Sequence, residues 1–280
     1  MHLSELVKRC LREHNLYPRK SFSQNFMVDE QILQRMADYA DLKETDKVME
    51  IGAGLGFLTK ILAKNATEVI AIELDRNLVK ILNRELGSNK KIKIVQGDFL
   101  KVKINGYNKV VSNPPYSKIS QIVFKILSEK FDLGVLTLQK DFAKRLVAQA
   151  GTKDYGRLTV MAYVRAKFEF MEDVPATAFY PSPDVSSAIL RIKPRKKMPV
   201  KILDWNIFDD TVRLLFTQRK RILKKAFRIF TKKGWRENGV KDFVQRVPSA
   251  FLERRVFTLT PSEFGAISNA IFEERVNYQY

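Results

Sequence analysis

Hydrophobic and polar positions between residues 29 and 138 follow two periods in turn. Short apolar runs, typical of buried strands, alternate with segments whose apolar residues recur at helical spacing. Strands are predicted at Lys47–Ile51, Glu68–Leu74, Ile92–Val95, Lys109–Ser112 and Gly134–Leu138. Helices are predicted at 29–40, 57–64, 77–86 and 119–127. Because strand–helix alternation is typical of a parallel sheet with helices on both faces, the pattern predicts an α/β fold.

The pattern changes on either side of this region. After a predicted helix at 141–150, two β-type runs at Arg157–Arg165 and Val185–Lys193 flank a constrained loop, Phe179–Pro183. Residues 194–199 are typical of a linker, and no strand is predicted from Trp205 onward. We therefore expect a basic N-terminal tail (1–28), an α/β domain (29–199) and a smaller helical domain (200–280).

Net charge narrows the choice of partners. Fifty Lys and Arg against 31 Asp and Glu give +19, which attracts nucleic acid first and an anionic membrane surface second. Ten Lys and Arg and no acid lie between Asp210 and Glu237, and apolar residues such as Phe208 and Val212 occupy the opposite face of the predicted helix. This spacing predicts a phosphate-tracking surface, with four cations assigned to RNA contact: Lys220, Arg221, Lys224 and Arg228.

Composition also excludes several classes of protein. Cys10 is the single cysteine, and both histidines lie in the first 14 residues, so we expect no intrachain disulfide, no metal site and no Ser–His–Asp chemistry. The N-terminus lacks the apolar core of a signal peptide, and no apolar run approaches the ~18 residues that span a bilayer. We therefore expect a cytoplasmic protein that acts without a membrane.

A glycine loop follows the first predicted strand. The sequence Gly52-Ala53-Gly54-Leu55-Gly56 lets the backbone approach a ligand closely before a helix begins. A dinucleotide fingerprint needs its third glycine at the position of Phe57, and no Walker lysine follows Gly56. The spacing argues against a dehydrogenase and favours a nucleoside ligand without phosphates, of which S-adenosyl-L-methionine is the common example.

Acidic residues end the next two predicted strands. Glu73 comes 21 residues after Gly52, where a carboxylate can accept from both ribose hydroxyls, and Asp98 can accept from an adenine amino group. Because the carboxyl ends of parallel strands share one edge of the sheet, we expect both side chains to line one crevice with the glycine loop.

The fourth predicted strand ends in Asn113-Pro114-Pro115-Tyr116. Two prolines remove two amide donors and stiffen the loop, which leaves the Asn113 side-chain oxygen and the Pro114 carbonyl as acceptors. If both acceptors bind the two hydrogens of an adenine N6 amino group, they would favour a pyramidal nitrogen. The lone pair of that nitrogen can then attack a methyl sulfonium. Tyr116 would stack on a base that has left its neighbours. We therefore predict methylation of adenine N6.

With these residues in hand, the chain resembles the KsgA-type ribosomal RNA adenine dimethyltransferases. The resemblance runs from about Ser21 to Lys193 and continues more weakly through the helical tail. Besides the motifs above it rests on three segments: Ser23-Gln24-Asn25-Phe26, Gly151-Thr152-Lys153-Asp154-Tyr155-Gly156-Arg157-Leu158 and Phe179-Tyr180-Pro181-Ser182-Pro183-Asp184-Val185-Ser186-Ser187. The departures are Met27 and Pro114, where the family commonly has leucine, and Ser23, where it often has glycine.

The resemblance implies a Rossmann-like methyltransferase domain followed by a smaller helical domain. It implies dimethylation of N6 on two adjacent adenosines near the 3′ end of small-subunit ribosomal RNA, with an N-terminal segment closing over the cofactor. The implied contacts with S-adenosyl-L-methionine come from Asn25, Met27, Gly52, Gly54, Glu73, Asp98 and Asn113. It also implies that Tyr116 and Phe179 sandwich the target adenine. The partners would be the small ribosomal subunit and its RNA, and the protein would bind them as a monomer.

Other functions remain open at this point. An Erm-like enzyme acting on large-subunit RNA, or a DNA adenine methyltransferase, could share the Asn-Pro-Pro-Tyr chemistry. A ribosome-assembly or transcription factor could retain the fold without catalysis, although intact Asn113 and Tyr116 argue against that. The segment 151–158 and the basic tail favour the small-subunit enzyme.

Overall fold

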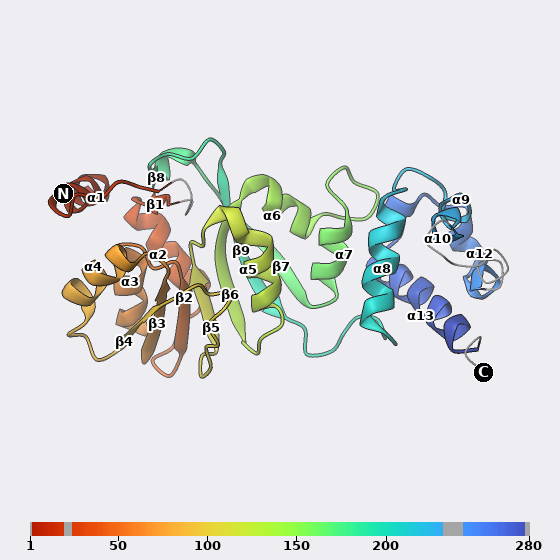
Figure 1. Cartoon of the computed structure of the whole chain (residues 1–280), viewed down its shortest axis with the longest axis horizontal. Helices are drawn as coiled ribbons and strands as arrows, with labels where there is room; N and C mark the ends of the chain where they lie inside the picture. Colours follow the sequence, from red (N-terminus) through yellow and green to blue (C-terminus); the bar gives the residue numbers. More distant parts are fainter. Residues whose placement is uncertain (1, 20–23, 232–242, 278–280) are drawn as a thin grey trace. The chain divides into compact units, whose positions relative to one another are not determined.

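The chain folds into two units. The structure, a computed structural model, describes residues 2–19, 24–231 and 243–277. One unit consists of residues 1–143 and 168–194 and contains most of the strands, and the other consists of 144–167 and 195–280 and is mainly helical (Figure 1). Residues 144–167 thus belong to the helical unit, whereas the sequence pattern placed the boundary at 199.

A seven-stranded sheet forms the centre of the first unit, in the order β4-β3-β2-β5-β6-β9-β7. The strands are β2 (Lys47–Ile51), β3 (Glu68–Glu73), β4 (Ile92–Gln96), β5 (Lys109–Ser112), β6 (Leu133–Gln139), β7 (Ala166–Val174) and β9 (Ser187–Pro194). The first five are mutually parallel. The prediction of a parallel α/β sheet is therefore confirmed, with every predicted strand of this group within two residues of its place.

Strands β9 and β7 extend the sheet beyond β6. β9 runs antiparallel to β6, with a register from Gly134 opposite Ile192 to Gln139 opposite Ser187. The predicted β-type run at 185–193 is confirmed as β9. β7 lies at the edge beside β9 and was not predicted, because its Lys, Glu and Asp residues interrupt the apolar pattern.

The helices of the first unit also match the sequence pattern. They are α2 (Glu30–Tyr39), α3 (Phe57–Asn65), α4 (Arg76–Leu86) and α5 (Ile119–Ile126), and α6 (Lys140–Val147) crosses the boundary between the units. Aspartates cap two of them: Asp29 accepts from the Ile32 amide at 3.1 Å, and Asp75 accepts from the Asn77 amide at 2.9 Å. Such caps satisfy amides that have no partner within the helix and so fix where each helix begins.

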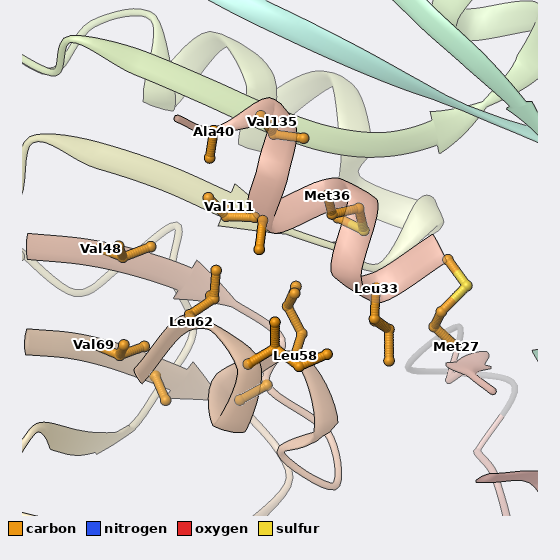
Figure 2. Close-up of a cluster of buried hydrophobic side chains, with 14 of the residues drawn as sticks. Met27, Leu33, Met36, Ala40, Val48, Leu58, Leu62, Val69, Val111 and Val135 are labelled. Atoms are coloured by element: carbon orange, nitrogen blue, oxygen red, sulfur yellow. The ribbon is translucent and has the colours of Figure 1, made fainter. Parts of the chain in front are cut away.

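One apolar layer packs α2 and α3 on the sheet. Figure 2 shows Leu33 and Met36 of α2 beside Leu58 and Leu62 of α3, over the strand residues Val48, Val69, Val111 and Val135. Successive strand residues point to opposite faces. Val110 and Leu136, one position away from Val111 and Val135, are also fully buried, so the sheet is covered on both sides.

The N-terminal residues include a helix and a short strand. Residues 3–13 form helix α1 (Leu3–Glu13), in which Val7 and Leu11 lie four residues apart and are buried. After it, β1 (Phe26–Met27) pairs antiparallel with β8 (Phe179–Tyr180), with Phe26 opposite Tyr180 and Met27 opposite Phe179. The sequence pattern assigned residues 1–28 only as a basic N-terminal segment and predicted no helix there, because two spaced apolar residues are a weak signal although they suffice to dock α1.

The second unit contains α7 (Arg157–Tyr163), α8 (Trp205–Phe216), α9 (Leu223–Ala226), α10 (Arg228–Thr231), α12 (Ser249–Leu252) and α13 (Pro261–Asn277). The prediction of a strand at 157–165 is wrong, since α7 occupies residues 157–163 and a turn follows it. Its five residues from Leu158 to Ala162 are all buried, and an apolar run buried on every side has no periodicity to distinguish a helix from a strand. The prediction of a helical tail is confirmed for the described residues.

The predicted basic helix is interrupted. Ile222 is extended (φ −65°, ψ 146°) and forms a β-bridge with Arg255, so residues 217–222 separate α8 from α9. Lys220 and Lys224 therefore do not share one helix face, and Lys232, which continues the same four-residue spacing in the sequence, lies outside the described residues. The prediction of a single amphipathic helix is therefore wrong. Its apolar residues Phe208, Val212 and Leu215 are nevertheless buried, as expected.

Candidate methyltransferase active site

A cavity opens at the carboxyl ends of the parallel strands in the first unit. It encloses about 1070 Å³, counting its mouth, and residues of the segments 24–27, 50–58, 72–78, 97–99 and 113–118 line it. Ligands of open α/β sheets bind at this edge. The site residues assigned from sequence in this unit all line the cavity except Phe179.

The glycine loop connects β2 to α3 and forms the floor of the cavity. Gly54 has φ +59°, and a Cβ atom there would lie 3.3 Å from the Phe26 ring. Gly56 has φ +81°, and a Cβ atom there would lie 2.6 Å from Leu86. Only glycine tolerates both the positive φ and the close approach. The loop therefore lets the N-terminal segment lie directly over the backbone at Gly54.

Glu73 ends β3 and is 7% exposed. One carboxylate oxygen accepts from the Gly54 amide and the other from the Asp75 amide, each at 2.8 Å. Burial raises the pKa of Glu73 above its ordinary value, and the two backbone amides oppose that rise. Each oxygen keeps a further lone pair, so the carboxylate can also accept from ribose hydroxyls.

Asp98 follows β4 and has two partners. Its Oδ1 accepts from the Leu100 amide at 2.9 Å, and its Oδ2 lies 3.1 Å from Nζ of Lys118. Partial burial tends to raise the pKa of Asp98, but the Leu100 amide and Lys118 lower it below its ordinary value. Sequence reasoning missed Lys118, although it lies only two residues beyond Tyr116.

Asn113 has an unused acceptor. Its Nδ2 donates to the Asn25 backbone carbonyl at 3.2 Å, while Oδ1 is buried without a hydrogen-bond partner among the described residues. An unsatisfied buried acceptor costs about 1–3 kcal/mol. Because most such atoms in proteins are paired, this one points to a donor that arrives with a ligand. Pro114, the next residue, is buried and lines the same cavity.

Tyr116 and Phe179 lie together at one end of the site. Their ring centroids are 6.5 Å apart and their planes meet at 75°, so the rings contact edge to face. Phe179 is 3% exposed within the apolar layer of Figure 2, whereas Tyr116 is half-buried and lines the cavity. A base sandwiched between two rings needs nearly parallel planes. The structure brings the two residues together without that arrangement.

The N-terminal segment reaches the cavity through β1. Asn25, Phe26 and Met27 line it, and Met27 also packs beside Leu33 in the apolar layer (Figure 2). Gln24 donates to Asp75 Oδ2 at 3.0 Å, which fastens the segment next to Glu73. Sequence reasoning gave Gln24 no individual role, because a contact across 51 positions leaves no local signal.

Glu50, near the end of β2, is a buried acid to which the sequence pattern gave no role. It is 2% exposed, lines the cavity, and accepts from the Thr59 hydroxyl at 2.6 Å. Burial raises the pKa of Glu50 to about 8. The carboxyl group is therefore largely neutral at pH 7.

This pKa predicts a pH dependence of stability. The unfolded chain ionises Glu50 near pH 4.5 while the folded chain holds the proton to about pH 8, so stability falls as pH rises across that window. We expect Glu50→Gln to leave the melting temperature nearly unchanged at pH 4.5 and to raise it relative to the parent at pH 8. Thermal unfolding of both proteins at the two pH values tests this. Equal differences at the two pH values would contradict it.

The four cations assigned to RNA lie in the second unit. Lys220, Arg221, Lys224 and Arg228 are exposed, on the turn before α9, on α9 and on α10. Arg219, by contrast, donates to the carbonyls of Thr152, Lys153 and Tyr155 and lies over the Phe257 ring. Arg219 therefore holds the segment 152–155 in place.

Two further features concern metals and membranes. Within residues 2–19, 24–231 and 243–277, no group of three or more His, Cys, Asp or Glu side chains is placed to hold a metal ion. In the same part of the chain, no helix combines the length and the apolar character needed to cross a bilayer.

The fold and the cavity define a class of protein. A Rossmann-like sheet, a glycine loop, an acid at the end of β3 and an Asn-Pro-Pro-Tyr loop at the end of β5 together define an S-adenosylmethionine-dependent methyltransferase. The profile of the family described as "Ribosomal RNA adenine dimethylase" matches residues 15–250. The chain belongs to this family.

Individual relatives agree with this assignment. A Methanosarcina mazei protein is 39% identical over 96% of this chain and 98% of its own length, and a Methanopyrus kandleri protein is 37% identical over 97% and 98%. Both carry the name "Probable ribosomal RNA small subunit methyltransferase A".

Solved structures show the same fold. A dimethyladenosine transferase from Plasmodium falciparum superposes with a TM-score of 0.77 at 25% identity, covering 88% of this chain and 97% of its own. The 23S rRNA methyltransferase ErmE superposes with a TM-score of 0.66 at 27% identity, covering 89% and 100%.

Proposed function

We propose that this protein transfers two methyl groups to N6 of each of two adjacent adenosines near the 3′ end of small-subunit ribosomal RNA. The names of the 37–39% identical archaeal relatives favour the small subunit as substrate. A substrate of this kind implies a cytoplasmic enzyme, which we expect to act as a monomer on one subunit at a time.

The observation that carries the proposal is the unsatisfied Oδ1 of Asn113. It is buried beside the cavity, and its Nδ2 is already engaged by the Asn25 carbonyl, so Oδ1 is the atom left to face a ligand. An adenine N6 amino group supplies the donor that this atom lacks. The Pro114 carbonyl would accept the second N6 hydrogen. Proline has a backbone carbonyl but no amide hydrogen, so at this position the backbone offers only an acceptor.

These acceptors address the weakness of adenine as a nucleophile. The N6 lone pair is delocalised into the ring, and acceptors on both hydrogens favour a pyramidal nitrogen that recovers the lone pair. S-adenosyl-L-methionine, when bound, supplies an electrophilic methyl group on a sulfonium. No strong base is required, since the nitrogen becomes acidic after the attack, and the buried acceptors gain strength from their low-dielectric surroundings.

The cavity has the donors and acceptors that the cofactor needs. Glu73 would accept from the ribose hydroxyls, and Asp98 from the adenine amino group of the cofactor. The backbone at Gly52 and Gly54 would approach the cofactor closely, and Asn25 and Met27 would cover it from the N-terminal segment. The polar contacts of Glu73 and Asp98 support these roles, since each carboxylate is already fixed by a backbone amide.

We assign RNA contact to the helical unit, through Lys220, Arg221, Lys224 and Arg228. All four side chains are exposed to solvent, where phosphates can approach them, and phosphate contacts position a protein without reading sequence. If the complex engages six to ten phosphates, affinity should fall about 10³–10⁵-fold between 50 and 200 mM salt.

Single alanine variants at these positions test the assignment. Each should lower the slope of log Kd against log salt by about one unit, because each removes one counterion-releasing contact. The matched control is Lys60→Ala, an exposed lysine on α3, which should leave the slope unchanged. Equal slopes for all five proteins would remove the RNA contact from this surface.

The reaction itself is tested by nucleoside mass spectrometry after incubation with S-adenosyl-L-methionine. Unmethylated small subunits and naked large-subunit RNA are the parallel substrates, and samples without the methyl donor are the control. N6,N6-dimethyladenosine in the small-subunit sample alone is the expected result. Tight subunit binding without methylation of either substrate would indicate an assembly factor on a methyltransferase fold.

A second candidate is methylation of large-subunit RNA. The observation that favours it is the ErmE superposition, which covers all of that chain. The archaeal relatives weigh against it, since their identity is higher and their printed names refer to the small subunit. Methylation of large-subunit RNA alone would establish it.

A further inference from the structure

The hydroxyl of Tyr116 ends in a buried contact far along the chain. It lies 2.6 Å from Oγ of Ser187, a residue 71 positions away. Ser187 is fully buried at the first position of β9. Neither the Asn-Pro-Pro-Tyr chemistry nor the acceptors on N6 use this contact.

Ser187 is a fixed point in the sheet. It pairs with Gln139 at the end of β6, and the neighbouring Ser186 carbonyl accepts from the Lys140 amide at 3.0 Å. A hydroxyl on such a backbone has little freedom to follow a moving partner. The contact therefore constrains Tyr116 rather than Ser187.

The Tyr116 ring has two restraints. Ser187 holds its hydroxyl tip, and Phe179 contacts the ring edge to face. Burial raises the pKa of Tyr116 to about 12, so the hydroxyl keeps its proton and the hydrogen bond persists across the neutral range. Pro115, immediately before Tyr116, stiffens the backbone that carries the ring.

We propose that Ser187 is a positioning residue that, together with the edge contact from Phe179, holds the Tyr116 ring in the position on which the target adenine stacks. This rests on the proposed function, in which Tyr116 receives the base after it leaves its neighbours. A ring free to tilt would accept the base at many angles. A ring held at its tip by Ser187 and against rotation by Phe179 presents N6 to Asn113 in one orientation, which is the condition for efficient transfer.

The proposal predicts a loss in turnover rather than in binding. We expect Ser187→Ala to lower kcat about tenfold, the effect of losing one buried hydrogen bond in the transition state. The Kd values for cofactor and for the small subunit should stay within about twofold, because phosphate contacts supply most of the affinity for RNA. Ser186→Ala is the matched control, since the contact of Ser186 with Lys140 uses its backbone carbonyl.

Tyr116→Phe tests the same bond from the other side and removes only one oxygen atom. If Ser187 acts through that oxygen, the single variants and the double variant should share one defect. Ser187→Thr keeps the hydroxyl and should restore turnover. If the fold-losses in kcat of the two single variants multiply in the double variant, Ser187 does not act through the Tyr116 hydroxyl. That result would overturn the proposal.

A spectroscopic readout separates positioning from a general structural role. RNA carrying 2-aminopurine at the target adenosine should be quenched when the base stacks on Tyr116. We expect brighter emission from the Ser187→Ala and Tyr116→Phe complexes than from the parent and Ser186→Ala complexes. Parent-like turnover and quenching in Ser187→Ala, with an active parent, would overturn the proposal alone. A parent that methylates no adenosine would overturn the proposed function as well.

Discussion

Replacing Asn113 with alanine should lower the rate of methyl transfer about 10²–10³-fold, the usual effect of removing one preorganised partner of a transition state. Oδ1 of Asn113 is a buried acceptor with no partner in the part of the chain that the structure describes, and an alanine cannot accept from N6. Stability should not fall in parallel. The variant loses the hydrogen bond to the Asn25 carbonyl, but it also loses an acceptor whose desolvation was uncompensated.

Three measurements on Asn113→Ala check this result. Single-turnover methylation gives the rate, thermal unfolding gives the stability, and subunit binding gives the Kd, which we expect to be unchanged. Asn105→Ala, at an exposed loop position, is the matched control. A variant that methylates at more than a tenth of the parent rate would show that Oδ1 is not the acceptor on N6.

Replacing Glu73 with alanine should raise the Kd for S-adenosyl-L-methionine by about 10²-fold or more. Each hydrogen bond to a charged group contributes about 1.5–3 kcal/mol, and both ribose hydroxyls would lose their acceptor. The Gly54 and Asp75 amides also lose theirs, so the melting temperature should fall. Isothermal titration and thermal unfolding measure the two effects.

Glu73→Gln makes a sharper version of the test. Both carboxylate oxygens accept from backbone amides. A glutamine must therefore direct its own amide nitrogen at one of these two amides, which places two donors against each other. We expect an intermediate Kd and an intermediate melting temperature. Glu85→Ala, an exposed glutamate near the end of α4, is the control. Parent-like cofactor affinity in Glu73→Ala would remove Glu73 from the ribose site.

The parallel half of the sheet could be predicted from sequence because its signals are local. Both faces of these strands are covered, and residues that point to opposite faces, such as Val110 and Val111, are equally buried, as is Leu136. Their strands are therefore continuous apolar runs. Glu73 ends such a run and Asn113 directly follows one, whereas Asp98 lies two residues beyond the partly buried edge strand β4, and parallel strands bring all three ends together. Strand and site were therefore predicted from the same stretches of sequence.

The remaining features depend on contacts between distant segments. Pairing of β1 with β8 joins residues more than 150 positions apart, and no pattern in either dipeptide indicates its partner. The run at 157–165 is rich in residues that favour strands, yet the Thr159 hydroxyl bonds the Gly156 amide and the Arg145 carbonyl at a helix start. Tertiary packing on every side of α7 outweighs the intrinsic preference.

The prediction of one continuous basic helix failed for a related reason. Residues 208–229 have helical spacing throughout, but backbone pairing of Arg221, Ile222 and Leu223 with residues 254–256 holds Ile222 extended. Periodicity describes a possible helix and says nothing of a competing backbone partner. The charges remain exposed, so the electrostatic inference does not depend on the helix.

The division of the second unit between two stretches of chain has a consequence for synthesis. Helix α7 ends at Tyr163, whereas α8 and α13, which contact it, begin at Trp205 and Pro261. At common translation rates α13 follows α7 after about 5–20 s. During that interval the nascent chain carries an apolar helix without its covering partners. Vectorial folding therefore cannot complete this unit until α13 has been synthesised, and products terminated before α13 would present α7 to chaperones and proteases.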